Sequence, residues 1–222
     1  KSDSDRILIV DGARQVGKTY SISHVGRRLF KNYIEINFVE DSLGRKLFEN
    51  VAATEDFYLA VSMLAGDRMK DKENTLIFLD EIQVYPKLLT LLKFLKKEDR
   101  FTYIASGSLL GVTLMETTSI PIGSIETIRM YPLDFEEWLY ANDIGTAFVE
   151  SMKEKFLHEE SLDENTHSHM MNLFKKYLLV GGMPDAVNAY IAEKNIDTVR
   201  KVQEQIHQYY AIDASKYDEE RK

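Results

Sequence analysis

Several features are absent from this 222-residue sequence, and each absence excludes a class of protein. There is no cysteine, which rules out a disulfide framework and cysteine-ligated zinc and suits a reducing compartment. No run approaches the roughly 20 apolar residues that a membrane-spanning helix needs, and the sequence starts without the apolar core of a signal peptide. We therefore expect a cytoplasmic protein with no membrane insertion.

Basic residues are in the minority, because 28 Lys and Arg face 36 Asp and Glu and give a formal net charge of −8. A chain of this charge does not attract polyanions in general, so nucleic-acid binding would need a local basic patch. Four basic residues between Lys93 and Arg100 lie opposite the leucine face of their predicted helix, but Glu98 and Asp99 interrupt them. This pattern favours a solvated helix, and DNA contact stays an alternative.

Apolar runs alternate with helical patterns over the first 130 residues, as expected for a largely parallel α/β sheet. The run at 75–79 is apolar throughout, which predicts a central strand covered by helices on both faces. A Gly-, Ser- and Thr-rich segment before residue 125 predicts a loop that faces a ligand. The strands are predicted at 6–10, 33–38, 75–79, 101–105 and 125–129, and the helices at about 18–30, 42–50, 54–64 and from Pro86 onward.

Helical patterns alone follow residue 134, which predicts a second, helical unit. They lie at about 134–142, 146–159, 167–180, 184–193 and 197–210, with a flexible connection near 159–165. We expect an α/β core over 1–132, a helical lid over 133–195, and a helical linker over 196–222. The sequence begins with Lys and stops in a charged run, so we expect a C-terminal domain beyond it.

One motif predicts a phosphate-binding loop. Residues 12–19 read Gly-Ala-Arg-Gln-Val-Gly-Lys-Thr and match G-x-x-x-x-G-K-[ST], between a predicted strand and a predicted helix. Such glycines let backbone N–H groups surround a phosphate at the positive end of the helix. We expect Lys18 to reach the β- and γ-phosphates of a nucleotide and the Thr19 hydroxyl to bind Mg²⁺. The predicted nucleotide contacts are Gly12, Ala13, Arg14, Gln15, Val16, Gly17, Lys18, Thr19 and Tyr20.

Two acids end the apolar run at 75–79, where open α/β sheets bind their ligands. Asp80 is expected to hold Mg²⁺ through water. Glu81 is expected to polarise the attacking water as a general base, which requires a carboxylate beside the γ-phosphate. For Asp80 to approach the phosphate loop, the strand at 101–105 has to lie between the strands at 75–79 and 6–10.

A hydroxyl after the strand at 101–105 could sense the γ-phosphate. Ser106 and Ser108 are both candidates, and the sequence does not choose between them. His167 and His169 are not interpreted as a metal site, because a two-residue separation places them on different faces of a helix. Four arginines could supply charge to a transferring phosphoryl group, but surface ion pairing is the favoured interpretation for each: Arg27, Arg28, Arg100 and Arg129.

With these residues in place, the sequence resembles a bacterial and archaeal family of AAA-like ATPases that carry a C-terminal domain of unknown function. The resemblance rests on residues 12–19, 79–83, 105–111, 130–138 and 180–187, and so extends over nearly the whole chain. It implies a P-loop NTPase fold of the ASCE type, with an added strand and a catalytic glutamate, and ATP with Mg²⁺. It also implies that Gly181–Pro184 forms a turn near the nucleotide. Family members often place a basic residue where Ser124 follows Gly123 here.

The main functional hypothesis is an ATPase that acts as a nucleotide-dependent switch for an attached domain or protein partner. A motor with sustained turnover shares the same motifs with a slow nucleotide-dependent switch, and the slow switch is the preferred interpretation. A homo-oligomer or a protein partner is among the expected assemblies. The alternative is a nucleic-acid-binding module that ATP regulates with little hydrolysis. A small-molecule phosphotransferase is disfavoured, because no arginine-rich lid follows the phosphate loop.

Overall fold

The computed structural model describes residues 6–108 and 123–220, in two compact units, Lys1–Met130 and Tyr131–Lys222. Most of the predicted ligand-facing loop before β5, including the end of the segment 105–111, lies outside the described residues. No helix in the described ranges has the length and apolar character needed to cross a membrane.

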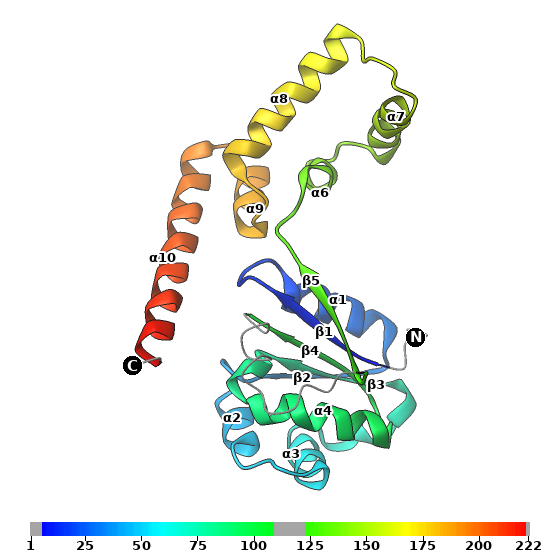
Figure 1. Ribbon diagram of the computed structural model, residues 1–222, viewed down its shortest axis with the longest axis vertical. Helices are drawn as coiled ribbons and strands as arrows, with labels where there is room; N and C mark the ends of the chain where they lie inside the picture. The colour runs from blue at the N-terminus through cyan, green and yellow to red at the C-terminus, as the bar shows by residue number, and fades with distance from the viewer. Residues whose placement is uncertain (1–5, 109–122, 221–222) are drawn as a thin grey trace. The chain divides into compact units, whose positions relative to one another are not determined.

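The first unit is built on a five-stranded sheet with the order β2-β3-β4-β1-β5, as Figure 1 shows. All four strand pairings are parallel. β4 lies between β3 and β1, so the predicted fold and the predicted place of the added strand are confirmed. The strands are β1 (Ile7–Gly12), β2 (Asn32–Asn37), β3 (Thr75–Asp80), β4 (Thr102–Gly107) and β5 (Ile125–Met130).

Helices cover both faces of the sheet, with α1 on one side and α2, α3 and α4 on the other (Figure 1). Side chains alternate accordingly along β1, because successive residues of a strand point to opposite faces. Ile9 packs in the cluster with α3 and α4, whereas Val10 packs with Ile22 of α1. The helices are α1 (Lys18–Leu29), α2 (Ser42–Phe48), α3 (Thr54–Ala65) and α4 (Pro86–Glu98), with short 3-10 turns η1 (Gly66–Met69), η2 (Lys72–Asn74) and η3 (Ile82–Val84).

The carboxyl ends of the three central strands meet at one edge of the sheet. β1 ends at Gly12, β3 at Asp80 and β4 at Gly107. The register pairs Asp11 with Gly107 and Leu79 with Ala105. Since parallel strands run in the same direction, the segments that follow them begin side by side. This edge brings together the motifs that lie far apart in the sequence.

The second unit is all-helical in its described residues, as predicted. Two helix boundaries differ from the prediction by three residues or more. α8 begins at Glu164 rather than His167, because the Asp163 side chain accepts a hydrogen bond from the Thr166 N–H and caps an earlier first turn. α10 continues past Tyr210 because no Gly or Pro interrupts the sequence beyond it. The helices are α6 (Phe135–Ala141), α7 (Thr146–Leu157), α8 (Glu164–Val180), α9 (Pro184–Glu193) and α10 (Ile196–Glu220).

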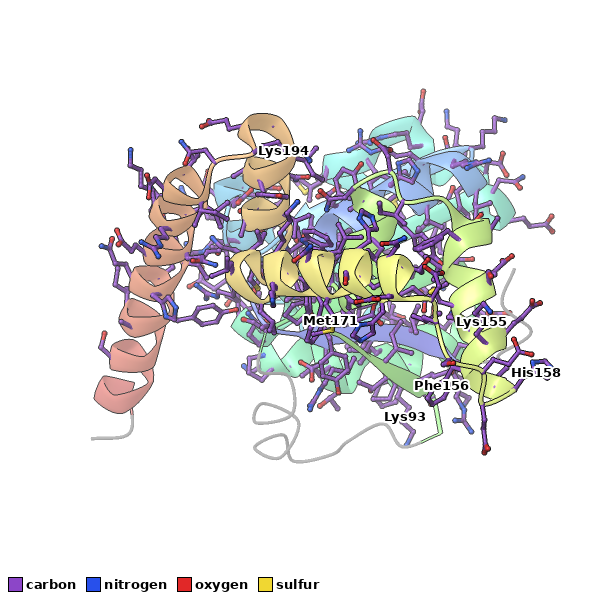
Figure 2. All side chains as sticks on the ribbon, turned by 90° about the horizontal axis from the view of Figure 1, so that it is seen from above. Lys93, Lys155, Phe156, His158, Met171 and Lys194 are labelled. Carbon is purple, nitrogen blue, oxygen red and sulfur yellow. The ribbon has the colours of Figure 1, made fainter. Side chains whose placement is uncertain are left out.

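An aromatic core holds the second unit together. The Trp138 ring is buried and stacks with Tyr190 at a centroid distance of 6.0 Å. Val199 of α10 is fully buried in the same cluster, so the first turns of α10 pack with the other helices of this unit. The predicted boundary between a helical lid over 133–195 and a helical linker over 196–222 stays a prediction. On the outer surface, Phe156 near the end of α7 exposes 82% of its area and Met171 of α8 exposes 41% (Figure 2).

The turn between α8 and α9 places Gly182 in close contact with another backbone segment. The Leu133 N–H donates to the Gly182 carbonyl at 2.8 Å, and a Cβ on Gly182 would lie 2.0 Å from the Leu133 oxygen. The Tyr177 hydroxyl donates to that same oxygen at 3.1 Å. A side chain at position 182 therefore has to push two backbone segments apart.

We expect Gly182→Ala to lower the free energy of unfolding of this unit by about 3 kcal/mol, the upper range for inserting a methyl group into a packed site. Urea unfolding followed by the fluorescence of Trp138, the one tryptophan of the chain, measures it. Gly145→Ala is the matched control, because nothing lies within 4 Å of its added Cβ. Equal unfolding midpoints for Gly182→Ala and the unmodified protein would contradict the expectation.

Candidate nucleotide-binding site

The loop between β1 and α1 has the backbone shape of an anion site. Gln15 and Gly17 both lie in the left-handed region, with φ of 63° and 94°. Alternation of handedness along a backbone produces concave sites lined by N–H groups. Gly12 contacts β5 so closely that a Cβ would lie 2.4 Å from the Met130 oxygen. α1 begins directly after Gly17, and no described side chain caps its N-terminus. The positive end of α1 is thus available to an anion.

Lys18 lies under this loop. Its Nζ donates to the Gly12 carbonyl at 2.9 Å and to the Ala13 carbonyl at 2.7 Å, and the residue is 5% exposed. Burial lowers the pKa of Lys18, and the charges of Glu81 and Asp80 oppose that effect. Because a buried ammonium costs free energy without an anionic partner, a phosphate beside Lys18 would stabilise it.

Asp80 is the centre of a hydrogen-bond network. Its buried carboxylate accepts from the Thr19 hydroxyl at 2.8 Å and from the Asn37 amide at 3.1 Å. The Glu81 N–H donates to it at 3.1 Å, and the Ser106 hydroxyl donates as well. The predicted metal residues Thr19 and Asp80 are therefore adjacent. A hydroxyl beside a carboxylate is an oxygen donor set that fits Mg²⁺.

Glu81 directly follows the last residue of β3 and has an unusual backbone conformation. Its φ of 58° places it in the left-handed region, which residues other than glycine rarely occupy outside turns and functional sites. The Gln83 amide donates to its carboxylate. Among the charges that raise the pKa of Lys18, that of Glu81 has the largest effect, so the predicted base lies close to the predicted phosphate-binding lysine.

The two candidate sensor residues have different surroundings, although both are buried. Ser106 donates to Asp80, so it contacts the predicted metal ligand. The Ser108 hydroxyl lies 3.5 Å from the Arg14 Nε and 3.4 Å from the Gln83 Nε2. Ser108 thus lies between the phosphate loop and the turn that carries Gln83. Phosphate sensing by either serine stays a prediction.

The remaining predicted nucleotide contacts have three kinds of surroundings. Ala13, Arg14 and Gln15 are exposed on the outside of the loop, where a ligand can reach them. Val16 is 1% exposed, so its side chain anchors the loop in the core. Tyr20 is 75% exposed and stacks on His24 at a centroid distance of 6.0 Å. A nucleotide contact by Tyr20 stays a prediction.

The arginines considered as charge donors form ion pairs or lie at the surface. Arg129 donates to the Asp11 carboxylate from Nε at 3.2 Å and from Nη2 at 3.0 Å. This ion pair joins β5 to the carboxyl end of β1, directly before the phosphate loop. Arg28 is exposed on α1. Two further pairs are Arg27 with Glu35 at 3.6 Å and Arg100 with Glu98 at 2.9 Å.

Sequence reasoning missed two residues of the site, Asn37 and Gln83. Asn37 ends β2 opposite Asp80 in the strand register, and a polar residue at the carboxyl end of a strand was the available signal. Gln83 lies two residues after Glu81, inside the segment 79–83 that carried the resemblance. Its contact with Glu81 depends on the η3 turn, which the sequence did not predict.

The described parts of the chain contain no metal site built from several His, Asp or Glu side chains. No group of three or more His, Asp or Glu residues within 6–108 and 123–220 is arranged to hold a metal ion. A magnesium site in a phosphate-loop protein does not need such a group. One hydroxyl and one carboxylate suffice there, because water and phosphate oxygens complete the coordination shell of the ion.

Comparison with known proteins identifies the family of the chain. A family model described as an AAA domain matches residues 4–139, which is more than half of the chain. The chain therefore belongs to the AAA domain family. A second model, described as a domain of unknown function, matches residues 171–222. A search of curated proteins found no significant match.

Three solved structures are similar to this chain at low sequence identity. The structure of C. elegans PCH-2 has a TM-score of 0.49 and 12% identity, over 91% of this chain and 62% of that one. The S. cerevisiae Hsp104–ADP complex has a TM-score of 0.48 and 16% identity, over 85% and 28%. The Aeropyrum pernix ORC1 protein in complex with DNA has a TM-score of 0.40 and 16% identity, over 66% and 44%. The present chain spans less than two thirds of each.

Proposed function

We propose that this chain binds ATP with Mg²⁺ and hydrolyses it, as a nucleotide-dependent switch for an attached domain or partner. The observation that carries the proposal is the convergence of Lys18, Thr19, Asp80 and Glu81 at one edge of the sheet. Membership in the AAA domain family supports the same activity.

Each of these residues has a task in this proposal. The loop and the N-terminus of α1 bind the phosphates, and Lys18 exchanges its carbonyl acceptors for phosphate oxygens. Thr19 and Asp80 hold Mg²⁺, which neutralises charge on the phosphates when bound. Glu81 accepts the proton of the attacking water. Asn37 and Ser106 orient the Asp80 carboxylate through their hydrogen bonds.

A slow switch is favoured over a motor. Arg129 is paired with Asp11, and the other arginines considered as donors contact acids or lie at the surface. NTPases that act without an arginine at the transferring phosphate turn over slowly. The proposal therefore places none of the four arginines considered as charge donors at the γ-phosphate: Arg27, Arg28, Arg100 and Arg129.

We expect turnover on the order of 10⁻² s⁻¹ or less for the isolated chain, with a rate per molecule that does not depend on protein concentration. Phosphate release measured over a hundredfold range of protein concentration tests this, with and without excess EDTA. EDTA should abolish turnover if Mg²⁺ is required. A rate that rises steeply with concentration would instead favour an assembled homo-oligomer.

The nucleic-acid alternative finds less support. The net charge of −8 opposes a polyanion. Of the basic run on α4, Lys96 pairs with Asp99 and Arg100 pairs with Glu98. DNA binding that weakens steeply with salt would restore this alternative.

A further inference from the structure

The second unit has an apolar groove of about 380 Å³ between α6, α7 and the first half of α8. Phe156 and Leu157 line it at the end of α7, and they are the two most exposed large apolar side chains of the described residues. Figure 2 shows Phe156 on the outer surface. The family models match residues 4–139 and 171–222, so most of the groove lies between the two matched ranges.

The groove offers few hydrogen-bonding partners to a ligand. Its described lining residues all lie in helices, whose backbone groups bond to one another. Glu136 and Lys153 are the charged residues among them, and they pair with each other at 2.6 Å. An extended peptide segment would leave its own N–H and C=O groups without partners on this surface, which costs free energy. An α-helix pairs these groups internally, so a helix is the backbone form that fits.

The size of the groove fits the side chains of a helix rather than the whole helix. One turn of an α-helix with its side chains occupies about 500 Å³, given a diameter of about 11 Å and a pitch of about 5.4 Å. A volume of about 380 Å³ therefore accepts the side chains of one helix face. The opposite face of that helix stays outside the groove, within reach of charges at its rim.

The segment that builds most of the groove carries the net charge of the whole chain. Residues 134–164 contain ten Asp and Glu and two Lys, which gives a formal charge of −8. The whole chain also has a formal charge of −8, so the remaining residues balance. Both lysines of the segment are paired with acids, Lys153 with Glu136 at 2.6 Å and Lys155 with Glu160 at 3.5 Å. The surroundings of the groove are therefore strongly acidic.

Two of these acids lie at the rim of the groove on α7. Glu150 directly follows Val149, and Glu154 directly follows Lys153, where Val149 and Lys153 line the groove. One position along a helix corresponds to a rotation of about 100°, so both acids flank the lining face. Both are exposed. An acidic rim beside an apolar floor is complementary to a helix that is apolar on one face and basic on the other.

We propose that this groove binds a basic amphipathic helix of a partner protein. An anionic membrane surface is disfavoured as the occupant, because it repels an acidic segment. Two copies of the chain that meet through the same groove are disfavoured as well, because two segments with a charge of −8 would face each other. The inference does not depend on the proposed ATP site, since the described lining residues all belong to the second unit.

Two designed peptides test the inference with the whole chain. Each is a labelled helix of about 18 residues, or five turns, with leucine along one face. The other face carries lysine in the basic peptide and glutamate in the acidic one. We expect the basic peptide to bind at least about tenfold more tightly, because only its charge complements the rim. Fluorescence anisotropy measures both affinities. Equal affinities, or binding of the basic peptide weaker than about 1 mM, overturn the inference.

Phe156→Ser is expected to weaken binding of the basic peptide about tenfold, because a phenylalanine at the groove no longer packs on the leucine face. Phe156 is 82% exposed, so the substitution keeps the fold, which the thermal unfolding midpoint checks. Leu178→Ser is the matched control, since Leu178 is an exposed residue of α8 that does not line the groove. Equal affinities of the two variants overturn the inference. A dimer in sedimentation velocity that Phe156→Ser abolishes would assign the groove to a second copy instead.

Glu150→Lys tests the acidic rim separately. We expect it to weaken the basic peptide about threefold at low salt and to have no effect at 1 M salt, where the Debye length falls to about 3 Å. Glu204→Lys is the matched control, because Glu204 is exposed on α10 and its replacement changes the net charge equally. Equal weakening in both variants would reduce the preference to net charge and overturn the assignment of the rim. None of these outcomes affects the proposed ATP site.

Discussion

Replacing Lys18 by alanine is expected to weaken ATP binding about 100-fold or more. Nζ is the buried ammonium at the phosphate loop, and its two carbonyl acceptors lie where the loop turns around the predicted phosphate. Loss of charge-assisted hydrogen bonds in a buried site costs about 1.5–3 kcal/mol for each bond. Since Lys18 is expected to contact two phosphates, the loss exceeds that of a single bond. Equilibrium binding of a fluorescent ATP analogue measures it.

Lys93→Ala is the matched control for that experiment. Lys93 is an exposed lysine of α4 (Figure 2), and its removal changes the net charge by the same amount. We expect its ATP affinity to equal that of the unmodified protein. Equal weakening in both variants would indicate a general charge effect, and unchanged binding in Lys18→Ala would place the phosphates elsewhere.

Glu81→Gln is expected to bind ATP at least as tightly as the unmodified protein and to hydrolyse it about 10²- to 10⁴-fold more slowly. The amide keeps the size of the side chain but cannot accept the proton of the attacking water. Asp80, Thr19 and Lys18 stay in place, so the phosphates and the metal keep their predicted contacts. Single-turnover hydrolysis with pre-bound ATP separates the chemical step from binding.

Glu49→Gln provides the comparison for Glu81→Gln, because Glu49 is exposed at the end of α2. Its turnover should equal that of the unmodified protein. Hydrolysis at the normal rate in Glu81→Gln would remove Glu81 from the role of general base. Normal hydrolysis in both Lys18→Ala and Glu81→Gln would refute the site as a whole.

Much of the fold could be predicted because its signals are local. The continuous apolar run of β3 predicted a strand buried on both faces, and all six of its residues are buried. The motif around Lys18 fixed the order of strand, loop and helix, since each residue type has a backbone or ligand task there. The limits of α8 and α10 were less accurate. The Asp163 cap sets the start of α8, and α10 continues past Tyr210 because no helix breaker follows.

The partners of the predicted site residues could not be read from the sequence. Ser106 and Ser108 were equivalent candidates at the end of one strand. In the structure Ser106 contacts Asp80, whereas Ser108 lies between Arg14 and Gln83. Ser106 lies inside β4, whereas Ser108 follows the last residue of that strand, Gly107. The period-two alternation of a strand therefore no longer sets the direction of the Ser108 side chain.

The sequence by itself determined which residue types the site contains, because a flexible phosphate loop, an ammonium and two acids are each specified by local spacing. Tertiary structure alone decided which of them touch. The strand order β2-β3-β4-β1-β5 brings Asn37, Asp80 and Ser106 to one edge although 69 positions separate the first from the last. Hydrogen bonds between such distant residues depend on sheet register and on the direction in which each strand ends, and local patterns do not encode these.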